Sequence, residues 1–219
     1  MLDRSRERED MVRHQLADRD IDDPQALAAM REVPRERFVP DEYAEHAYDD
    51  GPLPIDQGQT ISQPYIVALM IQAAELATGN RVLEVGAGSG YAAAVMSRIV
   101  REVIGIERHA PLVRAARDRI AELGYRNVEL IAGDGTRGYP DRAPFDAIIV
   151  SASGPVVPHA LQQQLDLGGR LVIPVGEGSA QRLLRVRRTG AAHFEDEDLG
   201  PVIFVPLIGE EGWPEPSRT

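Results

Sequence analysis

The stretch EVGAGSGY (residues 84–91) decides the fold. The apolar run RVLEV leads into its three glycines, and the helical pattern AAAVMSRI follows them. A strand that ends in glycines and opens a helix brings backbone N–H groups close to a ligand at the carboxyl edge of a sheet. Glycines also serve tight turns, so the loop alone is weak evidence for a site.

The spacing of the glycines separates two classes of ligand. They follow the pattern G-x-G-x-G, whereas G-x-G-x-x-G fits a pyrophosphate. Glu84 stands two residues before the first glycine, where its carboxylate repels phosphates and suits a ligand with an ammonium group. S-adenosylmethionine has an amino-acid tail, a sulfonium and no phosphate, so the spacing favours this cofactor. A nicotinamide dinucleotide stays open as the alternative.

Two further acidic residues follow the next two strands. Glu107 ends VIGIE about 20 residues after the loop, where a carboxylate can accept hydrogen bonds from both ribose hydroxyls. Asp134 in AGDG can accept from an adenine amino group, and Gly135 lets the backbone approach the ring. Each acid alone could be a helix N-cap or a loop carboxylate. Three acids at three successive strand ends together indicate a binding site.

Strand and helix patterns alternate on both sides of the loop. Apolar strands separated by helices are typical of a parallel sheet covered on both faces. The last two strand patterns have no helix between them, and Thr189-Gly190 can turn a hairpin, which predicts antiparallel strands at one edge. The expected parallel strands lie in residues 81–85, 101–107, 127–135, 145–153 and 168–176, and the expected antiparallel strands lie in 181–189 and 191–208.

The first 56 residues have a different pattern. Apolar residues of MVRHQLA (residues 11–17) recur at helical spacing, and Pro24 opens a second helical pattern. The prolines of VPRERFVP (residues 33–40) and GPLPI (residues 51–55) then break regular structure. We expect an N-terminal helical appendage that ends in an extended lead-in, followed by the main domain over residues 57–219.

The overall composition excludes several classes of function. The 219 residues carry 24 Lys and Arg against 35 Asp and Glu, a formal net charge of −11, so we expect no nucleic-acid partner. The absence of cysteine excludes disulfides, thiolate catalysis and zinc–sulfur sites. The five histidines are scattered, so we expect no metal. The charged N-terminus and the short apolar runs predict a cytoplasmic protein with no membrane partner, and we expect a monomer.

Eight segments occur in an order that identifies a family. They are MVRHQL, VPRERFVP, LPIDQGQTISQP, VLEVGAGSGY, GDG, FDAIIVSAS, GGRLVIPVG and FVPL. Together they resemble the protein-L-isoaspartate (D-aspartate) O-methyltransferases, and the likeness covers nearly the whole chain. Many methyltransferases share the glycine loop, whereas QTISQP (residues 59–64) and FVPL (residues 204–207) are much more particular to this family.

The resemblance implies a fold, a cofactor and a reaction. The fold is the Rossmann-like α/β fold of S-adenosylmethionine-dependent methyltransferases. The reaction transfers a methyl group from S-adenosylmethionine, leaving S-adenosylhomocysteine, to the α-carboxylate of an isoaspartyl residue in a damaged protein or peptide. The ester then collapses to a succinimide without the enzyme, and hydrolysis of that ring partly restores normal aspartate.

The resemblance also implies roles for individual residues. Ser62 matches a serine of the active site, and Val205 and Pro206 match a C-terminal strand that lines the substrate pocket. The candidate substrate-binding residues are Ile61, Ser62, Gln63, Val205 and Pro206. The candidate cofactor-binding residues are Gln59, Thr60, Ile61, Glu84, Gly86, Gly88, Ser89, Gly90, Glu107, Arg108, Asp134 and Gly135.

This reaction needs no general base. A carboxylate with a pKa near ~4 is already ionised at neutral pH, so the protein has chiefly to align the reacting atoms and exclude water. We expect Ser62 to donate a hydrogen bond that orients the substrate carboxylate; it could also be the N-cap of a helix with Pro64 at its first position. Two other functions stay open: methylation of another carboxylate, in a small acid or a specialised peptide, and non-catalytic cofactor binding.

Overall fold

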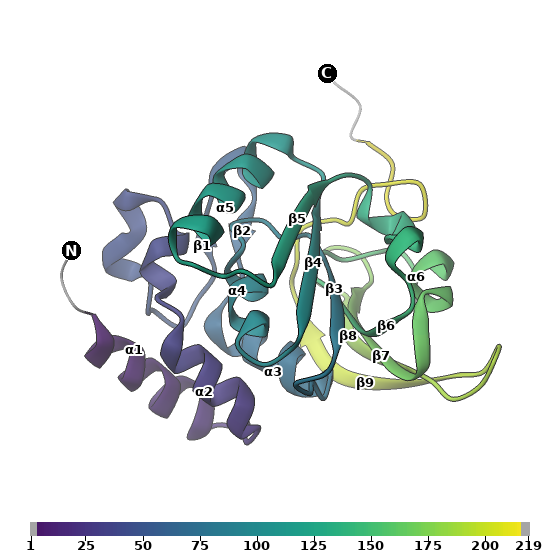
Figure 1. Cartoon of the computed structure of the whole chain (residues 1–219), viewed down its shortest axis with the longest axis horizontal. Helices are drawn as coiled ribbons and strands as arrows, with labels where there is room; N and C mark the ends of the chain where they lie inside the picture. The colour runs from purple at the N-terminus through teal and green to yellow at the C-terminus, as the bar shows by residue number, and fades with distance from the viewer. Residues whose placement is uncertain (1–3, 216–219) are drawn as a thin grey trace.

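A seven-stranded sheet forms the centre of the computed structural model, which describes residues 4–215 (Figure 1). The strand order is β5-β4-β3-β6-β7-β8-β9. Strands β3 to β7 run parallel, whereas β8 pairs antiparallel with both β7 and β9. This arrangement confirms the expected mostly parallel sheet with antiparallel strands at its C-terminal edge. The strands are β3 (Arg81–Val85), β4 (Glu102–Glu107), β5 (Val128–Ala132), β6 (Phe145–Val150), β7 (Leu165–Val175), β8 (Gln181–Arg188) and β9 (Phe194–Val202).

The order of the strands fixes where a ligand can bind. The chain passes from β3 outward to β4 and β5, and then returns to place β6 on the other side of β3. The connections therefore diverge at the carboxyl ends of β3, β4 and β6, and such a switch point leaves a crevice in open α/β sheets.

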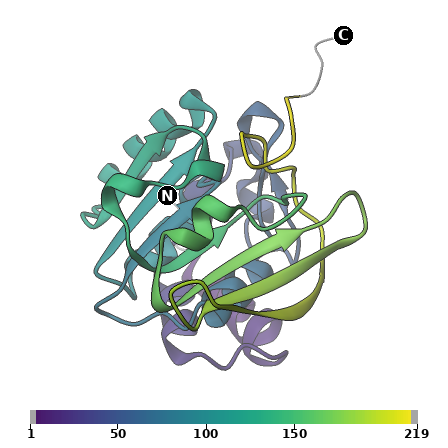
Figure 2. The same cartoon turned by 90° about the vertical axis from the view of Figure 1, so that its right-hand side faces the viewer.

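Helices cover the two faces of the sheet unequally. Side chains alternate along each strand, so Val82 faces one apolar core and Leu83 the other. The first core receives the helices α3 (Pro64–Ala73), α4 (Tyr91–Ser97) and α5 (Ala110–Glu122), and the second receives the short helix α6 (His159–Gln163). Figure 2 shows β8 and β9 as long strands at the edge of the sheet. No helix within residues 4–215 is long and apolar enough to cross a membrane.

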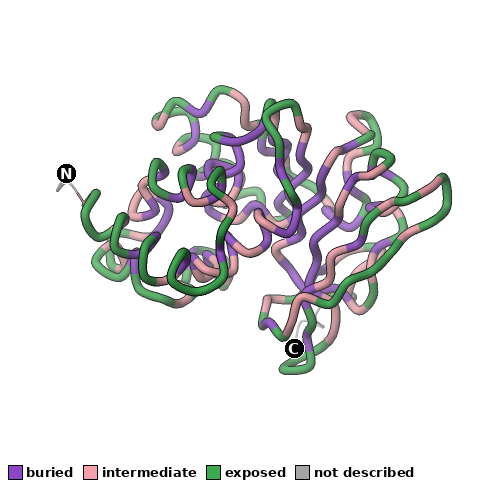
Figure 3. Tube along the Cα trace, turned by 90° about the horizontal axis from the view of Figure 1, so that it is seen from below, coloured by how far each residue is buried: buried purple, intermediate pink, exposed green. Residues whose placement is uncertain are grey.

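The N-terminal helices pack on the same face as α3 and α4. They are α1 (Ser5–Met11), the π-helix η1 (Val12–Ala17) and α2 (Pro24–Glu32), whose N-cap Asp23 accepts from the Gln25 N–H at 2.8 Å. Buried side chains such as Leu16 and Met30 join the first core. Figure 3 shows that the outer turns of these helices stay exposed while buried segments gather in the strands. The appendage thus shares the core of the sheet.

The lead-in after α2 is only partly extended, contrary to expectation. Two 3-10 helices, η2 (Arg35–Phe38) and η3 (Asp41–His46), occupy it. Their N-caps are Pro34 and Pro40, and a fixed proline φ suits the start of a helical turn as well as an extended chain. Prolines in this segment therefore start short turns instead of preventing them.

The segment before α3 forms a small hairpin. Strand β1 (Leu53–Pro54) pairs antiparallel with β2 (Thr60–Ile61), and the 3-10 turn η4 (Asp56–Gly58) connects them. Gly58 has a φ of 67°, a conformation that glycine adopts without strain. Only Ser62 and Gln63 separate the end of the hairpin at Ile61 from the start of α3 at Pro64.

The segment FVPL lies outside the last strand, which corrects the expectation that Val205 and Pro206 belong to one. Strand β9 ends at Val202. Beyond β9, the Gln181 side-chain amide binds both backbone groups of Phe204, as the backbone of a neighbouring strand would. Its Oε1 accepts from the Phe204 N–H at 2.7 Å, and its Nε2 donates to the Phe204 carbonyl at 3.1 Å. Pro206 forms an isolated bridge with Ser153, whose N–H donates to the Val205 carbonyl and whose carbonyl accepts from the Leu207 N–H.

Candidate active site

Three adjoining cavities open where the carboxyl ends of β3, β4 and β6 meet. The inner pocket, of about 520 Å³, lies between the glycine loop and α3. The second pocket, of about 510 Å³, lies between the same loop, the end of β4 and residues 205–208. The outer groove opens between the hairpin end and residues 201–205. Thr60 and Ser151 line all three, so the cavities meet at these two residues.

The glycine loop makes the wall that the two pockets share. Gly86 and Gly88, with φ of 84° and 51°, line both pockets. The N–H groups of Gly86 and Ala87 donate to the Ile106 carbonyl at 2.8 and 3.1 Å, which ties the loop to β4. A Cβ at Gly86 would lie 3.5 Å from the Ser151 backbone. The left-handed backbone favours glycine here, since other residues adopt such a φ only with strain.

Glu84 is a buried acid in the wall of the inner pocket. Glu84 is 1% exposed and lines this pocket, and its Oε2 has no hydrogen-bond partner within the described residues. Burial, and then the nearby charge of Glu107, raise the pKa of Glu84 well above its ordinary value of 4.5. An unpartnered buried carboxylate oxygen is costly, and a cation in the pocket would supply its missing partner.

Glu107 lines the second pocket with both oxygens already oriented. Its Oε2 accepts from the Gly88 N–H at 3.0 Å and its Oε1 accepts from the His109 N–H at 2.9 Å. A carboxylate has about four acceptor positions, so each oxygen can accept a further hydrogen bond. The backbone thus holds Glu107 in a fixed orientation suited to a pair of ligand hydroxyls. Gln59, Arg108 and Gly135 line the same pocket.

Asp134 and Gly90 lie beside these cavities without lining them. The Asp134 Oδ1 accepts from the backbone N–H of Thr136 at 2.9 Å, and its Oδ2 accepts from the Glu210 N–H at 2.8 Å. Asp134 is therefore the N-cap of the 3-10 helix η5 (Gly135–Arg137) and also anchors the C-terminal segment. A Cβ at Gly90 would face Ala116 of α5 at 3.4 Å, on the side away from the pockets.

Ser62 lies on the wall between the inner pocket and the outer groove, since it lines both. The alternative in which it caps α3 is not realised, because the N-cap is Gln63 and no side chain caps the helix. The Gln63 Nε2 instead donates to the Asp50 Oδ1 at 2.6 Å. The Ser62 hydroxyl thus does not cap α3, and Ser62 lies between two cavities. Ile61 lines the inner pocket, and Ser89 does so as well.

The outer groove contains fewer of the expected C-terminal residues than the resemblance implies. Val205 lines the outer groove and the second pocket, whereas Pro206 lines the second pocket alone. The remaining wall of the groove is largely apolar, with Ile66 of α3 and Phe204 among its residues.

Sequence reasoning missed Ser151 and the α3 wall. Ser151 follows β6 directly, so its position after a fourth apolar strand was a usable signal. Met70 and Ile71 line the inner pocket from α3, but their apolar pattern could not be told from ordinary core packing. Within residues 4–215, no group of three His, Cys, Asp or Glu side chains could hold a metal ion.

Comparisons with known proteins agree on one family. The family model described as protein-L-isoaspartate(D-aspartate) O-methyltransferase matches residues 6–212. Protein-L-isoaspartate O-methyltransferase 2 of Pelobacter propionicus is 59% identical over 207 residues, which cover 94% of this chain and 92% of that protein. The protein-L-isoaspartate O-methyltransferase of Methylorubrum extorquens is 58% identical over 214 residues, covering 98% and 93%.

A solved structure extends this likeness to the fold. It is assigned to the same kind of methyltransferase, comes from Plasmodium falciparum and was obtained in complex with S-adenosyl-L-homocysteine. It superposes with a TM-score of 0.80 at 28% identity and covers 92% of this chain and 98% of that one. The expected methyltransferase fold is therefore confirmed.

Proposed function

This chain belongs to the protein-L-isoaspartate(D-aspartate) O-methyltransferase family, and from that premise we propose that it methylates the α-carboxylate of isoaspartyl residues in damaged proteins or peptides. The observation that carries the proposal is the position of Ser62 on the wall between two cavities. One cavity has the acid and the glycines of a cofactor site, and the other is an open groove. A methyl group has to pass between two such cavities.

The residues of the two pockets fit S-adenosylmethionine. The unpartnered Glu84 oxygen would hold the ammonium group of its amino-acid tail, and Glu107 would accept from its ribose hydroxyls. Glycines 86 and 88 carry no side chain that would fill the pockets, and the Glu84 carboxylate would repel a pyrophosphate beside it. When bound, this cofactor supplies an electrophilic methyl group on a positively charged sulfur.

The chain's own part in the reaction is alignment. The substrate carboxylate is ionised at neutral pH and needs no base, so Ser62 would donate a hydrogen bond that turns one carboxylate oxygen toward the inner pocket. The apolar residues around the groove would exclude water from the reacting atoms. The resulting ester closes to a succinimide after release, and hydrolysis of the ring returns part of the damaged residue to aspartate.

One assay tests the proposal. Tritiated S-adenosylmethionine is incubated with the purified protein and either an isoaspartyl peptide or its normal aspartyl twin, and labelled ester is counted. We expect label in the isoaspartyl peptide alone. Equal labelling of both peptides would contradict the substrate assignment. Labelling of neither, with S-adenosylhomocysteine bound in calorimetry, would favour another carboxylate or a non-catalytic cofactor-binding role.

A further inference from the structure

Arg35 is a buried cation that the proposed function leaves unexplained. It begins η2, within the segment VPRERFVP, and its relative exposure is 0%. Within residues 4–215 no carboxylate lies within 4.0 Å of its guanidinium, whereas the ion-paired side chains of Arg31 and Arg182 are 41% and 50% exposed. Burial lowers the pKa of Arg35 from its ordinary value of 12.5. A buried charge without a counter-ion is expensive for the folded state.

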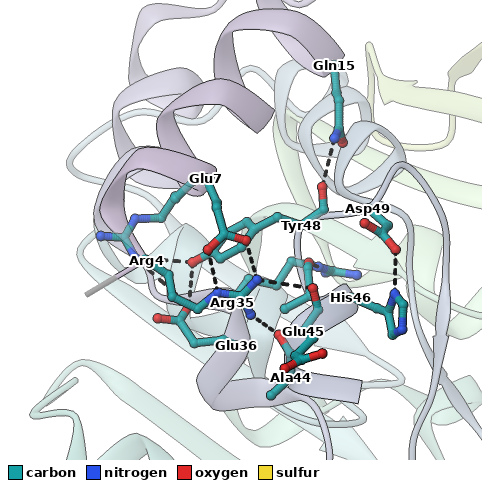
Figure 4. Close-up of polar contacts among 12 residues, drawn as sticks. Arg4, Glu7, Gln15, Arg35, Glu36, Ala44, Glu45, His46, Tyr48 and Asp49 are labelled. Carbon is teal, nitrogen blue, oxygen red and sulfur yellow. Dashed lines mark hydrogen bonds and ion pairs between the residues drawn. The ribbon is translucent and has the colours of Figure 1, made fainter. Parts of the chain in front are cut away.

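The guanidinium joins two backbone segments that are distant in sequence. Its Nε donates to the Ala47 carbonyl at 2.8 Å, and its Nη2 donates to the Ser62 carbonyl at 2.9 Å. Its carbon lies 4.9 Å from the ring centre of Tyr91, a residue of the inner pocket. Among the described residues, the Nη1 has no hydrogen-bond partner. Figure 4 shows Arg35 among the polar contacts of the appendage, where Gln15 separately reaches Tyr48.

The Ser62 carbonyl has no partner from the helix that follows it. The first carbonyl of α3 is that of Gln63, which accepts from the Val67 N–H at 3.2 Å. Pro64 has no N–H, and β2 has already ended at Ile61. The contact with Arg35 therefore fixes the peptide plane after Ser62, and with it the direction in which the Ser62 side chain leaves the backbone.

We propose that Arg35 is a positioning residue for methyl transfer: its planar guanidinium holds the Ser62 carbonyl and so aims Ser62 at the substrate carboxylate. The positive charge behind Ser62 also favours an anion in the adjoining groove, because no internal carboxylate neutralises it. The inference rests on the proposed function, since it gives Ser62 a substrate to orient. It assigns a positioning role to a buried residue of the N-terminal appendage.

The two hydrogen bonds of Arg35 require a planar, forked guanidinium, and a positive charge alone would not make both. Lysine keeps a positive charge but ends in a single ammonium on a flexible stem, so it cannot hold both carbonyls in one plane. Glutamine keeps an N–H donor and loses the charge. Gln15→Ala is the matched control, because it removes the 2.7 Å bond from Nε2 to the Tyr48 carbonyl in the same appendage without touching Ser62.

The experiment measures three quantities on the full-length protein: kcat/KM for the isoaspartyl peptide, Kd for S-adenosylhomocysteine, and hydrogen exchange of residues 59–66. In Arg35→Lys we expect kcat/KM to fall at least about tenfold, with a Kd within about threefold of the original. Exchange of residues 59–66 should rise while exchange of β4 stays unchanged. Arg35→Gln should lose more, and Gln15→Ala should keep kcat/KM.

Each outcome decides the matter. Full activity in Arg35→Lys would contradict the claim that a planar guanidinium must hold both carbonyls. Equal losses of kcat/KM and cofactor affinity in both Arg35 variants would show that Arg35 has only a general structural role. Unchanged exchange of residues 59–66 in Arg35→Lys would likewise overturn the proposal. Failure of the proposed function gives a different result, since the unaltered protein would then fail to label the isoaspartyl peptide.

Discussion

The glycine loop (residues 84–90) and the strip QTISQ (residues 59–63) both border the inner pocket, yet they are held in different ways. Backbone and carboxylate groups of β4 hold the loop, through the Ile106 carbonyl and Glu107. A hairpin and a buried arginine hold the strip, and Arg35 lies 27 residues before the serine that it contacts. The cofactor half of the site is thus a property of the sheet, and the substrate half depends on the appendage.

This difference predicts that the two halves can be damaged separately. Changes in the loop should weaken cofactor binding first, because the loop lines both pockets and its Gly86, Ala87 and Gly88 N–H groups are held by β4. Changes at Ser62, or at Arg35 that holds its carbonyl, should weaken methyl transfer while the affinity for the cofactor stays. The following variants test that separation in order of decreasing expected effect.

Gly86→Val should have the largest effect on cofactor binding. The φ of 84° strains any branched residue, and the side chain would project where Ser151 and both pockets meet. We expect the affinity for S-adenosylhomocysteine, measured by calorimetry, to fall more than about 100-fold, or about 2.7 kcal/mol. Gly124→Val is the control, since φ there is 77° and nothing lies within 4 Å. If Gly124→Val lost the same affinity, backbone strain alone would explain the weaker binding of Gly86→Val.

Glu84→Gln should weaken binding and stabilise the free protein. Because burial and Glu107 raise the pKa of Glu84, the folded state holds its proton more tightly than the unfolded chain does. Its contribution to stability therefore falls as pH rises above about 4.5 toward the raised pKa. We expect a higher Tm than the original at pH 7.5 without cofactor, and about tenfold weaker S-adenosylhomocysteine binding, about 1.4 kcal/mol.

The pH dependence of cofactor binding by the original protein tests the same role of Glu84. Its affinity for S-adenosylhomocysteine should increase as pH rises above the ordinary Glu84 pKa of 4.5 and through the raised one, since the ligand's ammonium group favours ionised Glu84. The increase should vanish in Glu84→Gln. A pH dependence that persists in the variant would place the titrating group elsewhere.

Asp134→Asn should give the smallest change. Partial burial opposes ionisation, but hydrogen bonds from Glu210 and Thr136 outweigh it and lower the pKa of Asp134. The stability that Asp134 contributes is present above pH 3.8 and is lost as pH falls through the lowered pKa. If Asp134 also accepts from an adenine amino group, the variant should narrow the preference for S-adenosylhomocysteine over S-inosylhomocysteine by a few-fold. An unchanged preference would leave Asp134 as an anchor of the C-terminal segment.

The sequence was sufficient for the elements whose signal is local. The strand ends that carry Glu84 and Glu107 were predicted because apolar runs, glycines and acids follow one another within a few residues. The family resemblance predicted Ser62 as a residue of the active site. Only the backbone geometry showed that Ser62 is not the N-cap of α3. Contacts that join distant segments had no such signal. The link from Arg35 to Ser62 depends on how the appendage packs, and the end of β9 depends on the Gln181 side chain.

The separation of the two halves is tested most directly by Ser62→Ala, with peptide kcat/KM and S-adenosylhomocysteine Kd measured on the same preparation. Losing a hydrogen bond to a charged group costs about 1.5–3 kcal/mol, so kcat/KM should fall at least about tenfold. The Kd should stay within about twofold. Thr189→Ala, at an exposed position between β8 and β9 that lines none of the three cavities, is the control and should change neither quantity. Equal losses of kcat/KM and affinity in Ser62→Ala, or an unchanged kcat/KM, would contradict the division of the site into a cofactor half and a substrate half.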